Sequence, residues 1–265
     1  MSKGYILTPS GPMPVKQLYT LTGGKVLPVD KAYTLTGGTA RLWYQRGTPL
    51  GNLSVGSTVK IAVGGKDYTW LVVHQGRPGR MYDASCNGVW VMMKGIYTTM
   101  KWDGSNNSYK DSDMTTYLNG TFLSLIDTDI RNAIKQVKIP YQNGTGSGGS
   151  LAAGANGLST KVFLLSGYEV GWTTSDNRYF PRDGAKLDYF GSGSGGNSKR
   201  IAYNGSSAAE WWLRSPSTYN VVGVWSVKSD GSNFNLRRDD SCGVRPCMIL
   251  PPSTLVDDTG HIIAA

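Results

Sequence analysis

The chain has 265 residues, enough for one large domain or for a domain with a smaller appendage. With 35 Gly, 15 Tyr, 8 Trp and only 17% charged residues, the composition excludes a disordered or long helical protein and indicates a loop-rich globular one. The formal net charge is +9 without any basic run of five residues. It indicates a solvated basic surface or attraction to an anionic partner such as a bacterial envelope polymer, ahead of nucleic acid.

The N-terminus MSKGYILTPSGPMPV lacks a charged region followed by an apolar one, so we expect no signal peptide. No run approaches the ~18 apolar residues that a membrane span requires, so we expect no membrane insertion.

The chain divides near residue 50. In the first part, LYTLTGG at 18–24 recurs as AYTLTGG at 32–38, and each copy reads as a short strand closed by Gly-Gly. Such small repeats cannot bury a core alone. We therefore expect residues 1–50 to form an attachment or oligomerisation module, with a flexible polar arm as the alternative, and residues 51–265 to form the ligand-binding domain.

The second part alternates strands and helices. Residues 53–63 and 66–75 predict a β-hairpin around Gly64-Gly65, and NGVWVMMKG at 87–95 predicts a further strand. Asp111, Ser112 and Asp113 offer N-caps for a helix through MTTYLNGTFLSLI. A second helix is predicted from Asp127, because Ile130, Ala133, Ile134 and Val137 recur at helical spacing. KVFLLS at 161–166 predicts a strand, and the tracts 143–150 and 191–198 predict mobile surface loops.

Two apolar, constrained motifs frame a polar segment in the last third. EWWLRSP at 210–216 and GVRP at 243–246 predict a rigid frame in which buried Arg214 and Arg245 each meet a carboxylate or several carbonyls. Glu210 is one of only two glutamates, and we expect it to contact an arginine structurally and not to act in catalysis. The predicted structural residues are Glu210, Trp211, Trp212, Arg214, Gly243 and Arg245.

Between the motifs lies a predicted hairpin with its turn at Ser229–Ser232. Alternation places Trp225 and Val227 opposite Ser226, and the apolar Phe234 and Leu236 are expected to pack inward. Tyr, Asn, Ser and Arg suit adaptable recognition, although a polar hairpin without a ligand is the alternative. The predicted ligand-binding residues are Thr218, Tyr219, Asn220, Ser226, Asn233, Asn235, Arg237, Arg238, Asp239 and Asp240.

The order TYLNGTF, KVFLLSGYEV, WWLRSP and GVRP resembles a bacterial and phage domain family with a C-type-lectin-like fold, over roughly residues 53–250. The resemblance implies an α+β class: a small twisted antiparallel sheet, two helices and long loops, beside a small β-rich N-terminal module. The chain is also similar to the variable proteins of diversity-generating retroelements, whose recognition residues precede a GVRP-like strand. Residues 5–24 resemble short modules of phage tail proteins.

Catalytic and metal chemistry find little support in the sequence. Only His74 and His261 are present, no G-x-S-x-G elbow occurs, and no carboxylate pair is legible, so we expect no enzyme, metal or cofactor. The signatures of calcium-binding C-type lectins are missing. Cys242 and Cys247 superficially resemble the copper-binding pair of the formylglycine-generating enzyme, but they flank GVRP and point to opposite faces if they lie on one strand. Buried free thiols are expected at both and at Cys86.

Together these features predict a phage virion protein, tail-associated and assembled in the bacterial cytoplasm, that binds a polysaccharide or protein receptor on the bacterial surface. The alternative is a structural virion component, such as a decoration or tail-collar protein, that contacts only other virion proteins. Strand sharing by the N-terminal repeats predicts a homo-oligomer, such as a trimer. A cellular surface-binding protein is disfavoured because no export signal is seen.

Overall fold

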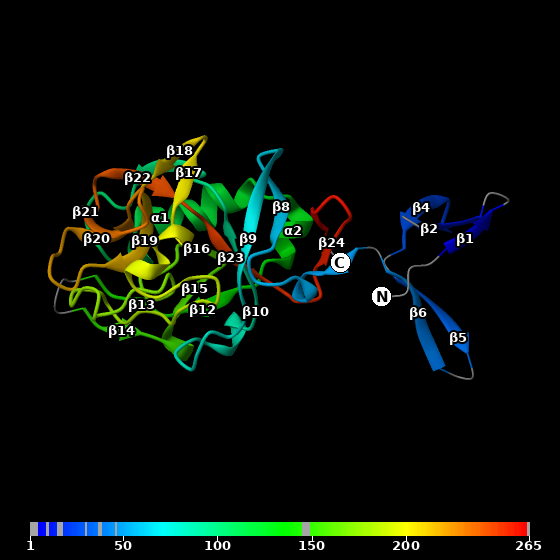
Figure 1. Cartoon of the computed structure of the whole chain (residues 1–265), viewed down its shortest axis with the longest axis horizontal. Helices are drawn as coiled ribbons and strands as arrows, with labels where there is room; N and C mark the ends of the chain where they lie inside the picture. Colours follow the sequence, from blue (N-terminus) through cyan, green and yellow to red (C-terminus); the bar gives the residue numbers. More distant parts are fainter. Residues whose placement is uncertain are drawn as a thin grey trace.

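A computed structural model describes residues 5–8, 11–14, 18–29, 31–36, 39–45, 47–144 and 149–263. From residue 47 onward the chain is built around two five-stranded sheets (Figure 1). The first has the order β16 (Val162–Phe163), β23 (Cys247–Leu250), β10 (Gly88–Met93), β9 (Lys66–Gly76) and β8 (Thr58–Val63). The second has the order β11 (Thr98–Lys101), β22 (Ser241–Val244), β19 (Trp211–Pro216), β20 (Gly223–Val227) and β21 (Asn233–Arg237).

Small sheets complete the domain. They are β12 (Val137–Ile139) with β15 (Leu158–Thr160), β13 (Tyr141–Gln142) with β14 (Leu151–Ala152), β17 (Ala202–Asn204) with β18 (Ser207–Ala209), and β7 (Thr48–Pro49) with β24 (Leu255–Val256) and β25 (Ile262–Ile263). Neighbouring strands are antiparallel except β19 and β22, where Trp211 lies opposite Gly243 in a parallel pair. The chain passes from the second sheet to the first at Arg245 and Pro246, between β22 and β23.

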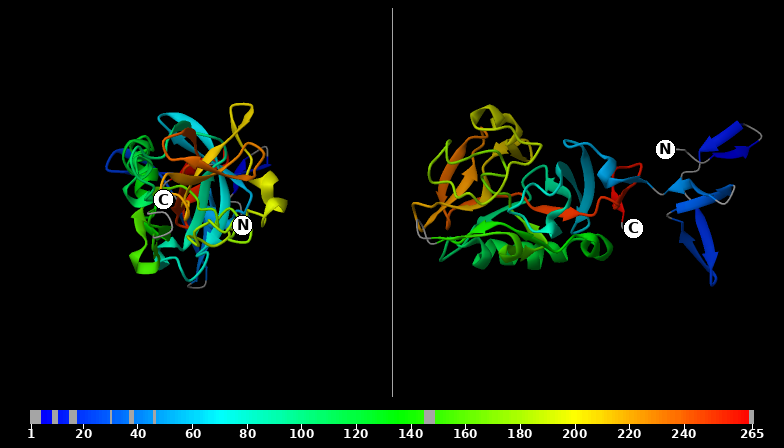
Figure 2. Two further views of the ribbon diagram at one scale, coloured as in Figure 1. Left: turned by 90° about the vertical axis from the view of Figure 1, so that its left-hand side faces the viewer. Right: turned by 90° about the horizontal axis from the view of Figure 1, so that it is seen from below.

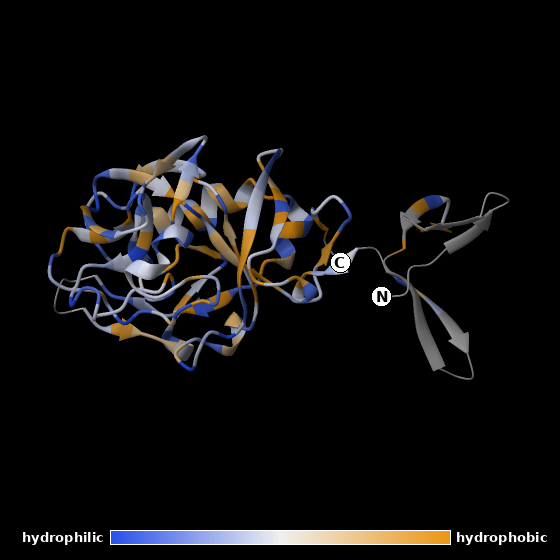
Figure 3. Ribbon diagram, in the orientation of Figure 1, coloured by the Kyte–Doolittle hydropathy of each residue, from blue (hydrophilic) through white to orange (hydrophobic). Residues whose placement is uncertain are grey.

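The core is rich in tryptophan. Every residue of β10, β19 and β23 is buried, which explains why β10 and β23 read as continuous apolar runs instead of alternating ones. Trp70, Trp90, Trp102, Trp211 and Trp212 are fully buried. Figure 3 shows hydrophobic residues along the central strands and hydrophilic ones in the connecting loops.

The predicted α+β, C-type-lectin-like class is wrong. Strands make up 38% of the chain and helix only 16%, with a single helix of seven residues or more, so the fold is β-rich with many small sheets. The long helix begins at α1 (Asp113–Tyr117) and continues through a π-helical stretch (Leu118–Phe122). The second, α2 (Thr128–Ala133), is only six residues long. Its predicted continuation through Val137 fails because Ile134 is extended and Val137 starts β12, where both side chains are buried.

Several local predictions are confirmed. β8 and β9 form a hairpin around Gly64 and Gly65, whose φ values of 61° and 76° are those that a tight hairpin turn requires. Ser112 caps the first helix by accepting a hydrogen bond from the Thr115 N–H at 3.1 Å. The strand predicted over 161–166 is shorter than expected, since only Val162 and Phe163 pair in a sheet.

The repeats of residues 18–24 and 32–38 contribute strands, as predicted. β3 (Tyr19–Thr22) pairs with β4 (Lys25–Pro28) around Gly23-Gly24, and β5 (Lys31–Thr36) pairs with β6 (Thr39–Gln45). A third hairpin joins β1 (Tyr5–Thr8) and β2 (Gly11–Pro14). The second Gly-Gly lies outside the described residues. Each described strand of this region pairs only within its own hairpin. Attachment and oligomerisation therefore stay predictions.

The domain is elongated, with different structures at its two ends (Figures 1 and 2). β7 lies at one end of the domain, where it pairs with β24 near the C-terminus, whereas β20 and β21 lie at the opposite end. A surface built on β20 and β21 therefore lies far from the point where the N-terminal hairpins join.

No helix in the described part of the chain is long and apolar enough to cross a membrane.

Candidate functional site

The WWLRSP and GVRP motifs form a buried frame. Trp211 and Trp212 are completely buried, and their ring N–H groups donate to the carbonyls of Arg200 at 2.9 Å and Met100 at 3.0 Å. Gly243 lies so close to β19 that a Cβ there would come within 2.5 Å of the Glu210 carbonyl. Trp211, Trp212 and Gly243 are thus packed inside the frame.

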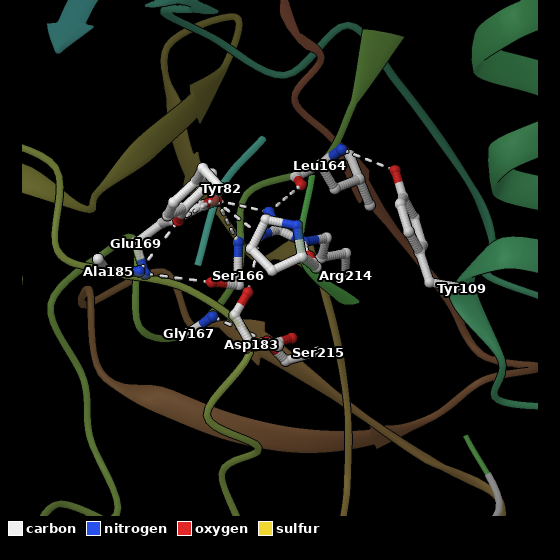
Figure 4. A network of polar contacts seen from close by, with 11 residues as sticks. Tyr82, Tyr109, Leu164, Ser166, Gly167, Glu169, Asp183, Ala185, Arg214 and Ser215 are labelled. Carbon is white, nitrogen blue, oxygen red and sulfur yellow. Dashed lines mark hydrogen bonds and ion pairs between the residues drawn. The ribbon is translucent and has the colours of Figure 1, made fainter. Parts of the chain in front are cut away.

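Arg214 occupies the centre of a buried polar network, shown in Figure 4. Its guanidinium binds the carboxylate of Glu169 through two contacts, of 2.5 and 2.7 Å, and both side chains are fully buried. The remaining donors reach the carbonyls of Pro140, Leu164 and Asp183 at 3.1, 2.9 and 2.9 Å. All five N–H donors of the arginine therefore have acceptors, which is the condition under which a buried charge is tolerated.

The same network joins several loops. Glu169 also accepts from the Tyr82 hydroxyl at 2.7 Å and the Ser166 N–H at 2.9 Å. Ser215 donates to Asp183 at 2.8 Å. Burial raises the pKa of Asp183 to about 7, and it raises the pKa of Tyr82 well above the ordinary value. No atom of Glu169, Asp183 or Arg214 is accessible to a ligand, so this network stabilises the frame.

The predicted contact between Glu210 and an arginine is wrong. Glu210 instead accepts a hydrogen bond of 2.6 Å from Ser226, and the partner of Arg214 is Glu169, the other glutamate of the chain. Arg245 is buried and donates to the carbonyls of Met93 and Lys94 at 3.2 and 3.0 Å, as predicted. Its guanidinium also stacks 4.5 Å from the Trp211 ring, and burial lowers the pKa of Arg245 to about 9.

An exposed cluster lies on the polar segment that this frame encloses. Tyr219 is 70% exposed, and its ring centroid lies 4.7 Å from that of Tyr179. The Arg178 guanidinium also lies 4.7 Å from the centre of the Tyr179 ring. Val221 is also exposed. The backbone carbonyl of Tyr179 accepts from the Thr218 N–H at 3.1 Å, which fixes the two loops to each other. We call the cluster Arg178, Tyr179, Tyr219, Val221, Arg237 and Asp239 the distal surface.

Arg237 and Asp239 complete the distal surface. Arg237 pairs with Asp239 through two contacts of 3.1 Å, and the two side chains are 62% and 41% exposed. An exposed pair of this kind contributes little to stability. Both groups can therefore turn to a ligand at small cost.

Most of the other predicted ligand-binding residues support the loops. The Thr218 hydroxyl donates to the Tyr179 carbonyl at 3.0 Å, the Asn220 side chain accepts from the Val222 N–H at 2.7 Å, and Arg238 donates to the Val221 carbonyl at 3.0 Å. Asp240 accepts from the Arg237 N–H at 3.1 Å and so closes a turn. These four side chains hold the backbone that presents Tyr219, Val221 and Arg237.

Two predictions about the hairpin β20–β21 are wrong. Ser226 is completely buried against Glu210, because β20 lies between β19 and β21 and both of its faces are covered. Phe234 was expected inside but is 47% exposed, because β21 is the edge strand of its sheet. Asn233 and Asn235 are half-buried, and a Cβ on Gly223 would come within 2.3 Å of the Asn235 amide oxygen. Register alone could not separate a covered central strand from an open edge strand.

The sequence did not reveal Arg178, Tyr179 and Val221 as part of the surface. Arg178 and Tyr179 lie about 40 residues before Tyr219 in the chain, in the loop TSDNRYFPRD. Only the pairing of distant loops brings Arg178 and Tyr179 next to Tyr219. An Arg-Tyr pair in a polar loop could nevertheless have indicated a binding surface.

The three cysteines are free and buried, as predicted. Cys242 lies on β22 and Cys247 on β23, so they belong to different sheets and not to one continuous strand. Burial raises the pKa of the Cys86 thiol to about 11, and it also raises the pKa of Cys242 and Cys247. High thiol pKa values are those of packing residues and not of nucleophiles.

The turn of the β20–β21 hairpin rests on the glycine-rich tract of residues 191–198, in which Ser194–Lys199 form a 3-10 helix. The mobility predicted for this tract stays a prediction. Arg200 anchors that tract through the carbonyls of Gly191 and Gly193, both at 2.8 Å. Gly231 has φ 82°, and a Cβ there would lie 2.1 Å from the Asn197 carbonyl oxygen. The middle of the other predicted loop, 143–150, lies outside the described residues.

This contact gives a first prediction. We expect Gly231→Ala to destabilise the domain by about 2–4 kcal/mol, combining the strain of a left-handed alanine with displacement of the Asn197 backbone. Gly205→Ala is the matched control, because Gly205 also has a positive φ of 61° but a Cβ there meets no atom within 4 Å. It should cost only about 1–2 kcal/mol in urea unfolding. Equal costs for both variants would show that the hairpin does not rest on the glycine-rich tract.

Comparison with known proteins gives one match. No curated protein and no solved structure matches the chain. The model of the domain of unknown function DUF6273 matches residues 87–252, a span that runs from the start of β10 to just beyond β23 and includes the buried frame and the distal surface. Because this match covers more than half of the chain, the protein belongs to the DUF6273 family.

Proposed function

We propose that this protein is a receptor-binding component of a phage tail, in which the distal surface recognises a ligand on the bacterial cell. The observation that carries the proposal is the stack of exposed Arg178 and Tyr219 on half-buried Tyr179, together with the solvent-exposed Arg237–Asp239 pair of the same polar segment. Exposed tyrosine and arginine side chains are the residues that most often dominate binding energies at interfaces.

The construction beneath the surface supports the same proposal. The loops that present Tyr219 and Arg237 are tied to Tyr179 and to each other by hydrogen bonds, and they rest on a frame with a fully partnered buried arginine. Such a frame allows the presented side chains to differ without loss of the fold, as loops on rigid scaffolds generally do.

The position of the surface also fits an adhesin. Strands β20 and β21, the second of which ends at Arg237, lie at the end of the domain opposite β24, the strand with which β7 pairs (Figure 1). A module attached to a particle through its N-terminal part would present this end outward.

The test is binding of the fluorescently labelled full chain to a panel of bacterial strains. The site variant combines Arg178→Ala, Tyr219→Ala and Arg237→Ala, all at exposed side chains that leave the supporting hydrogen bonds of the loops in place. We expect strain-selective binding by the parent chain and at least a tenfold loss in the variant, since tyrosine and arginine hot spots cost about 2 kcal/mol or more each.

The matched control combines Arg80→Ala, Lys60→Ala and Leu125→Ala, which remove two exposed cations and one exposed apolar side chain elsewhere on the domain. It should bind like the parent chain. Equal losses in both variants would point to non-specific charge attraction. Absence of binding to every strain, together with incorporation into particles, would favour the structural virion component instead.

A further inference from the structure

A hollow lies apart from the distal surface. Its walls are the start of β9, the segment that follows β10, and the tip of the β17–β18 hairpin, and its volume is about 550 Å³. In Figure 1 the β8–β9 and β17–β18 hairpins both reach the top of the domain. The volume lies within the range of roughly 300–1,000 Å³ that is usual for small-ligand sites.

The walls are held in place by backbone hydrogen bonds between the three segments. The Ile96 N–H donates to the Tyr203 carbonyl at 2.9 Å, and the Lys94 N–H donates to the Thr69 carbonyl at 2.9 Å. The Tyr97 ring packs against those of Tyr68 at 5.4 Å and Phe122 at 4.8 Å. The hollow therefore exists before any ligand arrives, which reduces the entropy cost of binding.

The chemistry of the lining is aromatic and cationic. Tyr68, Tyr97 and Tyr203 contribute rings, and Tyr203 is 52% exposed. Lys66 and Lys94 contribute exposed ammonium groups. Asp67 is the only carboxylate of the lining, and the His261 ring holds it at 2.7 Å. The lining therefore carries two lysines against one aspartate, so its formal charge is positive.

From these features we infer that the hollow binds an acidic saccharide, a sugar unit that carries a carboxylate or phosphate group. Tyrosine rings offer apolar faces to the C–H groups of a sugar and hydroxyls to its polar rim, and the two lysines attract its charge. A flat base is less well suited, because the Tyr68 and Tyr97 rings meet edge to face at 63° and leave no parallel aromatic slot. The inference does not depend on the proposed function, since the hollow and the distal surface share no residue.

The experiment is calorimetric titration of the purified full chain with tetragalacturonic acid, with a neutral galactose tetramer and with a short oligoadenylate. We expect saturable binding of the acidic sugar, about tenfold tighter than that of the neutral one, and weaker at about 0.5 M salt. Tyr203→Ala should weaken it about tenfold, and Lys66→Gln with Lys94→Gln should abolish the preference for the acidic sugar.

Tyr19→Ala and Lys110→Gln are the controls, at an exposed tyrosine and an exposed lysine outside both the hollow and the distal surface, and both should bind as the parent does. No saturable binding to either sugar, tighter binding of oligoadenylate, or equal losses in the controls would each overturn the inference. The calorimetric titration uses soluble sugars and not cells, so its failure leaves the distal-surface proposal intact. Loss of cell binding in the triple variant likewise does not affect the inference about the hollow, which the titration tests separately.

Discussion

Replacing Glu169 with Gln should destabilise the domain by about 3–5 kcal/mol, the typical cost of leaving a buried charge without its partner. The carboxylate accepts two contacts from Arg214 and further hydrogen bonds from Tyr82 and Ser166, all in a region without solvent access. Domains of ordinary stability unfold with about 5–15 kcal/mol, so much of the total depends on this carboxylate. Urea unfolding followed by tryptophan fluorescence measures the loss directly.

Glu210→Gln is the matched control, because it makes the same chemical change at the only other glutamate of the chain. Glu210 is half-buried and accepts one hydrogen bond from Ser226, which an amide oxygen can also accept. We expect a loss of about 1 kcal/mol or less. Similar losses for the two variants would mean that the Arg214 network does not dominate the stability of the frame.

The division of the last third into a frame and a presented segment could be predicted from the sequence. Paired Trp, Arg and Pro residues are costly to expose or to leave unpartnered, so their burial in WWLRSP and GVRP follows from composition alone. The hairpins around Gly64-Gly65 and Ser229–Ser232 were also legible, because turn chemistry is local. The helix cap at Ser112 belongs to the same class.

The partners across the fold could not be predicted. Glu169 meets Arg214 from 45 residues away, and Tyr179 meets Tyr219 from 40, so neither pairing leaves a local pattern. The fold class failed for a related reason. The helical periodicity near Ile130 is real, but Ile134 and Val137 are buried outside the helix, which ends at Ala133. Two short helical segments therefore led to an α+β prediction for a fold that consists mainly of strands. The acidic-saccharide hollow is likewise assembled from three distant segments.

A pH dependence follows from Asp183. This carboxyl is fully buried, accepts one hydrogen bond from Ser215, and has its pKa raised by burial from 3.8 to about 7. Between these two values the folded chain holds a proton that the unfolded chain has lost. The contribution of Asp183 to stability is therefore fully present below about pH 4 and is lost progressively as the pH rises to about 7. Each pKa unit corresponds to about 1.4 kcal/mol, so the loss amounts to a few kcal/mol.

Asp183→Asn isolates this effect, because the amide oxygen can still accept from Ser215 and no charge can form. We expect the free energy of unfolding of the variant to gain on that of the parent chain steadily between about pH 4 and pH 7, and then to keep a constant difference. Comparing the two proteins cancels the titration of the other carboxylates. The matched control is Asp230→Asn, because hydrogen bonds from Ser232 lower the pKa of this exposed carboxylate below 3.8. This variant should lose stability relative to the parent only as the pH rises toward about 4, and the difference should stay constant between about pH 4 and pH 7. Parallel pH profiles for the parent and the Asp183 variant would show that Asp183 is ionised in the folded protein, with its charge balanced by Arg214.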